Sequence, residues 1–376
     1  MIVRIGDICT PFSGFTPAAS ELFPSGKYPY FKVAEMNREA NQRVMTDTDA
    51  YVKESRKFFP KGAIVFPKNG AAIATNKKRI LGQDSIVDLN TGGVKPNTNL
   101  VSIDYLFYLF QHIDFAQYMR RGAVPTLDLK SVLALEIDLP SLTDQQRIVA
   151  ELDLLSDIVQ KKNSQLKTLD NLAQSIFHEM FGDPIVNERG WDYKRLDEVA
   201  EIVGGATPKT QIEEYWEGDN YWVTPAELHK EHYKGATERT ISNEAVRKTN
   251  VTLLPVGTVL LSSRAPIGKV AITTVPMYCN QGFKNLICSG ELNNEYAFQV
   301  LYSNTEYLNS LGTGATFKEI SKKTTEAIKI AVPPIELQDR FAERAKKIES
   351  EKEKIKASLA SAEQLFASRM EKYFNV

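Results

Sequence analysis

The chain has 376 residues, of which 43% are hydrophobic and 25% are charged, and its formal net charge at pH 7 is −1. This composition is typical of a globular protein with enough apolar residues for two domains. No apolar run is long enough to span a membrane and no leader peptide opens the chain, so we expect a cytoplasmic protein without a membrane partner. The near-neutral charge excludes a protein that grips nucleic acid through a broad basic surface alone.

A long amphipathic segment follows Pro140. Thr143 and Gln146 have the spacing of a capping box, which predicts that a helix begins there. A repeat of about 3.5 residues predicts that this helix lies along another helix, and Gly182 ends it. The apolar residues of the repeat are Leu152, Leu155, Val159, Leu166, Leu169, Ala173, Ile176 and Met180.

The C-terminal segment, which follows Pro333-Pro334, predicts the partner helix. Its apolar stripe is weaker, because it contains Lys352 and starts at Glu336 without a capping Thr, so we expect packing that is looser or partly given to partners. An offset of about 193 residues matches identical residues of the two segments, which indicates a duplication. The matched pairs are Pro140 and Pro333, Gln145 and Gln338, Arg147 and Arg340, Leu166 and Leu359, Ser175 and Ser368, and Phe181 and Phe374.

Each long helix is preceded by a similar region of short strands and Gly, Asn and Pro turns. In these regions Gly14-Phe15-Thr16-Pro17 aligns with Gly205-Ala206-Thr207-Pro208. The predicted strands are Ala63–Phe66, Ala71–Ala74, Ser85–Val87 and Leu135–Leu139 in the first region, and Val259–Ser262, Lys269–Thr273, Asn285–Cys288 and Ile328–Val332 in the second. Helices are predicted over Asp104–Met119 and Glu295–Leu311.

The expected fold class is therefore α+β. We expect two similar globular domains of mixed β-sheet with short helices, separated by two long antiparallel coiled-coil helices and related by an internal pseudo-two-fold duplication. The predicted boundaries are 1–140 for the first domain, 141–182 for the first helix, 183–335 for the second domain and 336–376 for the second helix.

The chain lacks the motifs of common DNA-acting enzymes. It has no P-loop, no Asn/Asp-Pro-Pro-aromatic loop of an amino-methyltransferase, and no Glu followed two positions later by Lys. His229 and His232 could share a helical face and hold a metal, but Glu227 and Glu231 are also typical of a solvated loop. The three cysteines lack metal-ligand spacing. We predict no catalytic residue, no metal site and no cofactor in this chain.

Polar residues with base-reading chemistry gather in glycine-bearing loops of both domains. Arg and Lys can donate to guanine O6 and N7, and Asn and Gln can pair with adenine N6 and N7. Any one loop could be an ordinary polar turn, but recurrence in both repeats favours a DNA interface. The candidate DNA-binding residues are Lys68, Asn69, Lys78, Arg79 and Asn97 in the first domain, and Ser263, Arg264, Lys269, Asn280, Gln281 and Lys284 in the second.

In the order, spacing and duplication of these segments, the chain resembles the specificity subunit of type I restriction–modification enzymes over essentially its whole length. The carriers are the proline-ended strands that lead to Gln145-Gln146-Arg147-Ile148 and Leu337-Gln338-Asp339-Arg340, the long helices, and the segments Pro255-Val256-Gly257-Thr258 and Ile267-Gly268-Lys269-Val270. The resemblance implies two target-recognition domains that each read half of a bipartite asymmetric sequence in double-stranded DNA. It also implies that the helices set the spacing and dock two methyltransferase subunits.

Partner subunits would supply the chemistry under this resemblance. The methyltransferase subunits and a restriction or motor subunit would bind S-adenosylmethionine, ATP and Mg, and this chain would bind none of them. One alternative is a non-catalytic coiled-coil adaptor that binds only proteins, which explains the helices but not the base-reading loops. A second is a nuclease in its own right, which the missing motifs disfavour.

Overall fold

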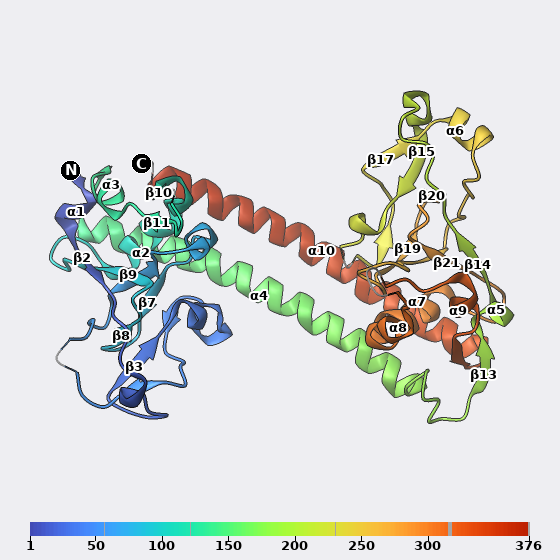
Figure 1. The fold of residues 1–376 in the computed structure, drawn as a ribbon, viewed down its shortest axis with the longest axis horizontal. Helices are drawn as coiled ribbons and strands as arrows, with labels where there is room; N and C mark the ends of the chain where they lie inside the picture. Colours follow the sequence, from blue (N-terminus) through green and yellow to red (C-terminus); the bar gives the residue numbers. More distant parts are fainter. Residues whose placement is uncertain (56, 121, 230, 315–317, 375–376) are drawn as a thin grey trace. The chain divides into compact units, whose positions relative to one another are not determined.

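The computed structural model describes residues 1–55, 57–120, 122–229, 231–314 and 318–374. The chain forms two compact units, of which the first comprises Met1–Lys161 and Ser358–Val376 and the second comprises Lys162–Ala357. Each unit holds one sheet-containing domain and a part of each long helix (Figure 1). No helix in the described part of the chain is both long and apolar enough to cross a membrane.

The two long helices are α4 (Leu142–Phe181) and α10 (Ile335–Tyr373), with 40 and 39 residues. At 1.5 Å per residue, each is about 60 Å long. The predicted cap of α4 is wrong by two residues, because the Ser141 hydroxyl accepts a hydrogen bond from the Asp144 amide at 3.2 Å and Thr143 lies inside the helix. Gly182 follows α4 in the left-handed conformation, with φ of 70°, as a helix-ending glycine does.

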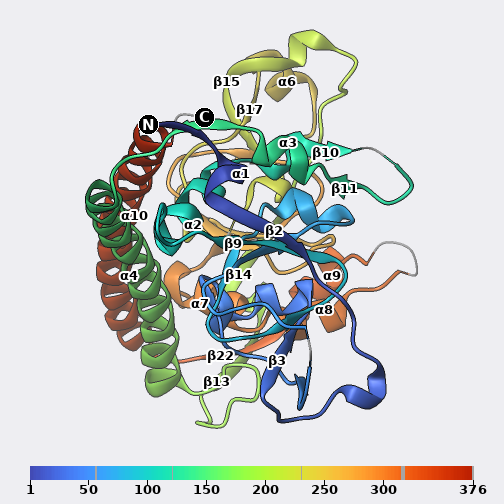
Figure 2. The same ribbon diagram turned by 90° about the vertical axis from the view of Figure 1, so that its left-hand side faces the viewer.

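The two helices pair in both units. In the first unit the beginning of α4 contacts the end of α10, where Glu151 lies 2.8 Å from Arg369 Nε and accepts a 2.6 Å hydrogen bond from Tyr373. In the second unit the end of α4 contacts the beginning of α10, and the Phe177 and Phe341 ring centroids are 5.3 Å apart. Because beginnings meet ends in both units, the helices are antiparallel, as predicted (Figure 2).

Lys352 interrupts the apolar stripe of α10 and lies between the two long helices. Its Nζ lies 2.6 Å from Asp170 on α4 and 2.6 Å from Glu349 on α10, and only 12% of the side chain is exposed. The polar position therefore forms an ionic contact between the two helices.

The two domains share one sheet topology, which confirms the duplication. The first domain has a five-stranded sheet of order β2-β9-β6-β7-β4, a three-stranded sheet β5-β3-β8 and a pair β1-β12. The second domain repeats this arrangement as β14-β21-β18-β19-β16, β17-β15-β20 and β13-β22. Both five-stranded sheets are mixed, with one parallel pair at the edge, β4 with β7 or β16 with β19.

The elements of the first domain are as follows. Its strands are β1 (Ile2–Arg4), β2 (Cys9–Ser13), β3 (Tyr28–Phe31), β4 (Val44–Met45), β5 (Tyr51–Val52), β6 (Ile64–Pro67), β7 (Arg79–Leu81), β8 (Ile86–Val87), β9 (Thr91–Pro96), β10 (Met119–Arg120), β11 (Thr126–Leu127) and β12 (Glu136–Asp138). Its α-helices are α1 (Ile5–Ile8), α2 (Ile103–His112) and α3 (Leu129–Leu133), and its 3-10 helices include η2 (Val33–Asn37), η4 (Ala71–Thr75) and η5 (Phe115–Tyr118).

The second domain has matching elements. Its strands are β13 (Asp192–Arg195), β14 (Ala200–Gly204), β15 (Trp216–Val223), β16 (Tyr233–Lys234), β17 (Arg239–Ile241), β18 (Val259–Leu261), β19 (Val270–Thr273), β20 (Tyr278–Cys279), β21 (Lys284–Cys288) and β22 (Lys329–Val332). Its α-helices are α5 (Leu196–Val199), α6 (Asn243–Lys248), α7 (Asn294–Ser303), α8 (Thr305–Leu311) and α9 (Lys322–Glu326), and its 3-10 helices include η7 (Pro225–Glu227).

The predicted strand Ala71–Ala74 is wrong, because this segment forms the 3-10 helix η4. Gly70 and Asn76, with φ of 78° and 52°, flank the helix and turn the chain away from the sheet. The predicted helix Glu295–Leu311 is divided at Asn304 into α7 and α8. The other predicted strands are present with shifts of one or two residues.

Each domain core continues into the long helices of its own unit. In the first unit, buried residues of α2 and the sheet pack with Leu152 of α4 and with Met370 and Phe374 at the end of α10. In the second unit, Tyr296 of α7 packs with Phe181 of α4, at 4.9 Å between ring centroids. Burial of this apolar surface fixes each sheet to its part of the helix pair.

Candidate nucleic-acid interface

Polar side chains gather at one end of the second domain's five-stranded sheet, where β18 ends and β21 begins. A bridge between Ser262 and Phe283 brings the two chain segments together there. We call this cluster the second polar end. Its residues are Arg264, Asn280, Gln281, Lys284 and Glu319, together with Ser263. The candidate Ser263 is 0% exposed and offers no surface to DNA, so its assignment is corrected to a supporting residue.

Glu319 lies at the centre of the second polar end. Its carboxylate oxygens are 3.0 Å from Arg264 Nε and 3.4 Å from Lys284 Nζ, and Lys284 also donates to the Ser263 hydroxyl at 3.3 Å. Partial burial would raise the pKa of Glu319, but the hydrogen bond and charge of Arg264, together with Lys284, hold that pKa below its ordinary value. Because the Arg264 side chain is 48% exposed, this ion-paired group can meet a ligand from solvent.

Asn280 and Gln281 belong to the turn that precedes β21. The Asn280 side chain accepts a hydrogen bond from the Gly282 amide at 2.9 Å, and the exposed Gln281 accepts one from the Thr207 hydroxyl. Gly205 makes this approach possible, since a Cβ there would lie 2.2 Å from the Asn280 carbonyl oxygen. The repeated Gly-x-Thr-Pro segment therefore lies against the polar end.

The first domain places Lys68 and Asn69 at the equivalent position, directly after β6. The Lys68 amide donates to the Asn90 carbonyl at 2.8 Å, and the Asn69 amide group lies 3.4 Å from the Leu89 carbonyl oxygen. Both side chains are half-buried. With Thr126, described below, they form what we call the first polar end.

Burial corrects the assignment of two candidates in the first domain. Lys78 and Arg79 are 0% and 6% exposed, so neither offers a surface to DNA. Lys78 Nζ donates to the Ile113 carbonyl at 2.7 Å, and Arg79 Nη2 donates to the Met36 carbonyl at 2.9 Å. Burial lowers the pKa of Lys78 to about 7. Both residues hold β7 to neighbouring segments of the domain.

Asn97 lies apart from the first polar end, whereas Lys269 lies beside the second, where the Ser262 amide donates to the Lys269 carbonyl at 2.9 Å. Asn97 is exposed but follows the far end of β9, which at about 3.3 Å per residue is roughly 20 Å from the first polar end. Lys269 is half-buried, and its Nζ donates to the Pro225 carbonyl at 3.0 Å, which ties β19 to η7. The structure therefore does not gather all eleven candidates.

The sequence analysis missed Thr126 and Glu319, one in each polar end. Each forms an antiparallel bridge with a candidate residue, Thr126 with Asn69 and Glu319 with Arg264. The flanking hydrogen bonds also correspond, because the Leu127 amide donates to Lys68 at 2.9 Å and the Ile320 amide donates to Ser263 at 2.9 Å. The offset of about 193 residues relates Thr126 to Glu319, so the duplication was a usable signal.

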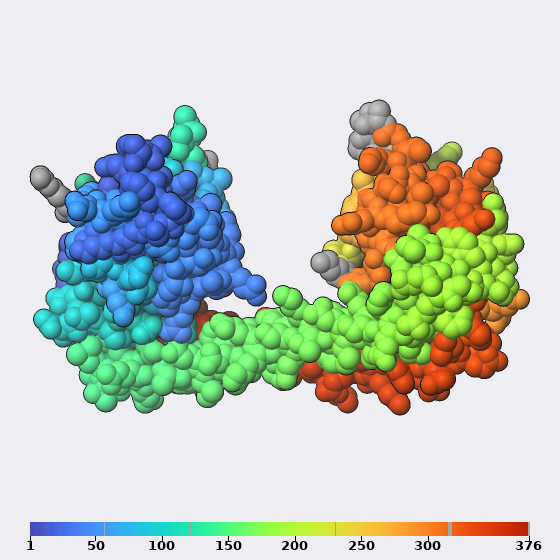
Figure 3. Space-filling model, turned by 90° about the horizontal axis from the view of Figure 1, so that it is seen from below, coloured from blue at the N-terminus to red at the C-terminus, as the bar shows by residue number. Residues whose placement is uncertain are grey.

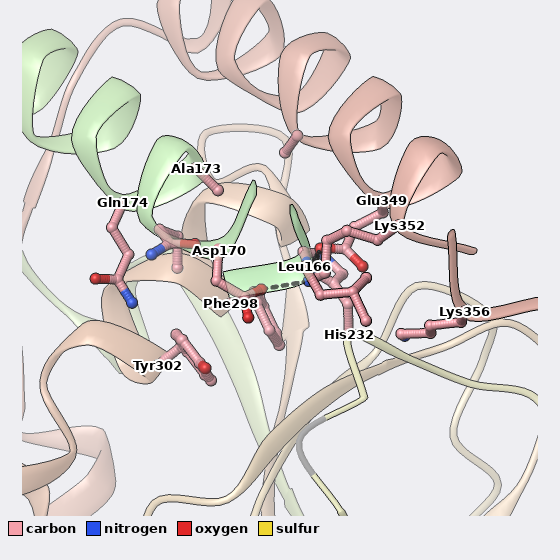
Figure 4. Close-up of a pocket in the computed structure, with 12 residues that line it drawn as sticks. Leu166, Asp170, Ala173, Gln174, His232, Phe298, Tyr302, Glu349, Lys352 and Lys356 are labelled. Carbon is pink, nitrogen blue, oxygen red and sulfur yellow. Dashed lines mark hydrogen bonds and ion pairs between the residues drawn. The ribbon is translucent and has the colours of Figure 1, made fainter. Parts of the chain in front are cut away.

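A second polar cluster joins the sheet of the second unit to its helices. His232 Nε2 lies 2.6 Å from Glu295 on α7, and its Nδ1 lies 3.5 Å from Glu349 on α10. Figure 4 shows His232 and Glu349 beside a cavity of about 240 Å³ that Asp170 and Lys352 also line. We call the His232, Glu295 and Glu349 group the stem joint. Its charges pair with one another, which suits a structural contact.

The first unit has an equivalent joint around Arg43, which precedes β4 as His232 precedes β16. Arg43 lies 2.8 Å from Asp104 on α2 and 2.7 Å from Asp153 on α4. Each domain thus uses one basic residue to connect its short helix to a long helix. Among the described residues, no group of three or more His, Cys, Asp and Glu is arranged to hold a metal ion.

The chain belongs to the family of the type I restriction modification DNA specificity domain, whose model matches residues 1–168 and 188–362. It is 39% identical over 158 residues to the type I restriction enzyme MjaIX specificity subunit of Methanocaldococcus jannaschii, a match that covers 41% of this chain and 37% of that protein. A second relative from that organism, the putative MjaX specificity subunit, is 26% identical, with 68% and 63% covered. The chain thus spans less than two thirds of these two relatives.

A longer match relates the chain to the HindI specificity subunit of Haemophilus influenzae, at 20% identity over 76% of this chain and 79% of that one. Two solved structures share the fold. The S subunit of a type I restriction–modification system from M. genitalium has a TM-score of 0.59 and 15% identity, covering 100% of this chain and 96% of that chain. A structure from work on assembly and conformational transition of the type I R–M system has a TM-score of 0.58 and 21% identity, covering 100% and 97%.

Proposed function

We propose that this chain is the sequence-specific DNA-recognition subunit of a type I restriction–modification system and that it works in the cytoplasm without catalytic residues of its own. The observation that carries the proposal is the pair of equivalent polar ends, built on the same sheet topology but with different side chains. Family membership supports it. A protein-only adaptor would give no reason for base-reading side chains at corresponding places in both domains.

Each domain reads one half of a bipartite DNA target. The first polar end offers Lys68, Asn69 and Thr126, whereas the second offers Arg264, Gln281 and Glu319. These sets present different hydrogen-bond donors and acceptors, so the two half-sites differ in sequence and the target is asymmetric. Residues on loops at a sheet end can vary without disturbing the strands beneath.

The helices set the separation of the half-sites and dock two methyltransferase subunits. Figure 3 shows α4 exposed along the surface in that view, and Leu154 and Leu172 are 62% and 45% exposed. Exposed apolar side chains on a helix favour a protein partner. The partner subunits, with a restriction or motor subunit, bind S-adenosylmethionine, ATP and Mg, while this chain binds no cofactor.

DNA affinity depends on the assembled complex. The net charge of the chain is −1, and Glu319 already pairs with Arg264 and Lys284. Because the chain has no excess of cations over anions, it should release few counterions from DNA on binding, so the chain alone binds DNA weakly.

The test is methylome sequencing of cells that express this chain with its methyltransferase subunit. The wild-type chain should give one bipartite methylated motif. Asn69→Ala should relax one half only, by about 1–3 kcal/mol of base discrimination if Asn69 makes a bidentate contact. Asn97→Ala is the matched control, because Asn97 lies at the far end of β9. The proposal fails if the wild-type chain directs no sequence-specific methylation, and assignment of the first polar end fails if Asn97→Ala alone changes the motif.

A further inference from the structure

We propose that Glu319 is a positioning residue that holds Arg264 toward a guanine, so that this pair specifies one G·C base pair of the second half-site. The inference rests on the proposed function and names the base chemistry of one of its sites. Arg264 is a candidate for DNA contact from its sequence context, whereas Glu319 lies outside the sequence motifs.

The backbone fixes Glu319 beside Arg264. Glu319 forms an antiparallel bridge with Arg264 and another with Thr313, where the two amides and carbonyls exchange hydrogen bonds of 3.0 and 3.1 Å. Its carboxylate is therefore held by a short paired segment. The carboxylate then receives Arg264 Nε at 3.0 Å, which restrains a side chain that would otherwise sample many rotamers.

The remaining donors of Arg264 match guanine. A guanidinium has five N–H donors, and the bond to Glu319 uses the one on Nε. The two terminal nitrogens can still form the paired hydrogen bonds to guanine O6 and N7 that arginine makes in the major groove. An arginine already oriented in the free protein loses less entropy when it binds.

Lys284 keeps the group attractive to DNA. Its Nζ lies 3.4 Å from the other Glu319 oxygen, and only 12% of its side chain is exposed. Two cations around one carboxylate leave a net charge of +1, so Glu319 orients Arg264 without making the site repel phosphates. Hydrogen-bond acceptors on guanine suit such a group better than the amino groups of adenine or cytosine.

The first domain provides an internal comparison. At the equivalent bridge it has Asn69 and Thr126, which are uncharged. Lys284 pairs with Gly204, the last residue of β14. At the equivalent place in the first domain, Gly92 pairs with Ser13, the last residue of β2. The positions of Arg264, Glu319 and Lys284 thus carry Asn, Thr and Gly in the first domain, and its Lys68 occupies the position of Ser263, as expected if the two ends read different bases.

The experiment compares the methylated motifs directed by four chains, each co-expressed with the methyltransferase subunit. Arg264→Lys keeps the charge but removes the planar fork, and should lower discrimination at one G·C position by about 5- to 150-fold. Glu319→Gln keeps the shape but removes the charge, and should relax the same position by about 2- to 5-fold. Glu326 is a surface carboxylate of α9 that lies 3.7 Å from Lys322. The variant Glu326→Gln is the matched control and should leave the motif unchanged.

Three results would overturn the inference. Glu319→Gln could leave the motif intact while Arg264→Lys relaxes it, in which case Arg264 acts alone. Glu319→Gln could relax a different position, in which case Glu319 reads a base itself. Glu319→Gln could also weaken methylation equally at every motif variant and lower the melting temperature of the protein. In that case the role of Glu319 would be structural. In all three cases the wild-type motif persists and the proposed function stands, whereas failure of that function would remove the wild-type motif itself.

Discussion

At the residue scale, two buried glutamines show what the duplication preserves. The Gln145 side chain accepts a hydrogen bond from the Ser102 amide at 2.8 Å and donates to the Pro140 carbonyl at 3.0 Å. The Gln338 side chain accepts a hydrogen bond from the Asn293 amide at 2.9 Å and donates to the Pro333 carbonyl at 2.7 Å. Pro333 precedes α10 as Pro140 precedes α4. Each amide therefore ties the start of a long helix to the cap of a short one.

Replacing Gln338 with Met should destabilise the protein by about 2–4 kcal/mol, because the buried Asn293 amide and Pro333 carbonyl lose their partner. Gln174→Met is the control, since Gln174 is exposed on α4 of the same unit and should change stability by no more than about 0.5 kcal/mol. The free energy of unfolding in urea measures both. Equal values for the two variants would show that the Gln338 hydrogen bonds add nothing.

Residue patterns predicted the polar ends only in part. Lys68, Asn69 and Arg264 follow buried strands, so their place at a sheet end could be read from the sequence. Lys78 and Arg79 could not be placed, because a short basic run gives no sign that a buried strand, β7, begins within it. Glu319 was missed because a search for hydrogen-bond donors passes over the carboxylate that orients them.

At the element scale, the joint around Arg43 in the first unit and the stem joint around His232 in the second unit differ in how their basic residue ionises. Arg43 stays charged at every physiological pH. Burial disfavours the charged form of His232, but hydrogen bonds to Glu295 and Glu349 outweigh burial and raise its pKa above the ordinary value. Asp170, Lys352 and the Tyr233 hydroxyl also face this group. The attachment of the second domain should therefore depend on pH.

A histidine with a raised pKa stabilises the folded state fully below its ordinary pKa of about 6.5, and this contribution is lost as pH rises through the raised value. The melting temperature of the wild-type protein should thus fall from about pH 6 upward through that value. His232→Gln should flatten this part of the curve. Arg43→Gln, the matched control, should lower the melting temperature by a similar amount at each pH. An unchanged pH profile in His232→Gln would contradict the assignment.

Helix ends and short strands limited prediction at this scale. The period of the apolar stripe located both long helices, because period and length are strong signals. The cap of α4 was misplaced by two residues, because Ser141 and Thr143 are both good cap residues and only packing decides between them. The segment Ala71–Ala74 reads as an apolar strand, but the left-handed residues on both sides of it prevent an extended path.

At the scale of the whole molecule, the duplication preserves the sheets and the long helices but not the polar ends. The five-stranded sheet, the three-stranded sheet and the terminal strand pair of the first domain repeat in the second, while the polar ends differ. The long helices repeat in length, with 40 and 39 residues. Changes to the helices and changes to the polar ends should therefore have separate effects.

Deleting one heptad from the middle of both helices should shorten the spacer and leave both half-sites unaltered. Seven residues span about 10 Å of helix, which corresponds to about three base pairs of DNA. The methylated motif of the deletion variant measures the number of unread base pairs between the half-sites. Deletion of the heptad from α4 alone is the control and should disrupt assembly. A double-deletion variant that reads new bases in the half-sites and keeps the same gap would show that the helices do not set the spacing.

The division of the two units along the chain also has a consequence for synthesis. The second unit is one continuous segment, Lys162–Ala357, whereas the first is completed by residues from Ser358 onward. Met370 and Phe374, which are buried in the core of the first unit, are translated more than 350 residues after that unit begins. At about 5–20 residues per second, the first domain waits on the ribosome for tens of seconds with part of its core uncovered. The last core residues of the domain that is translated first are therefore synthesised after the whole of the second unit.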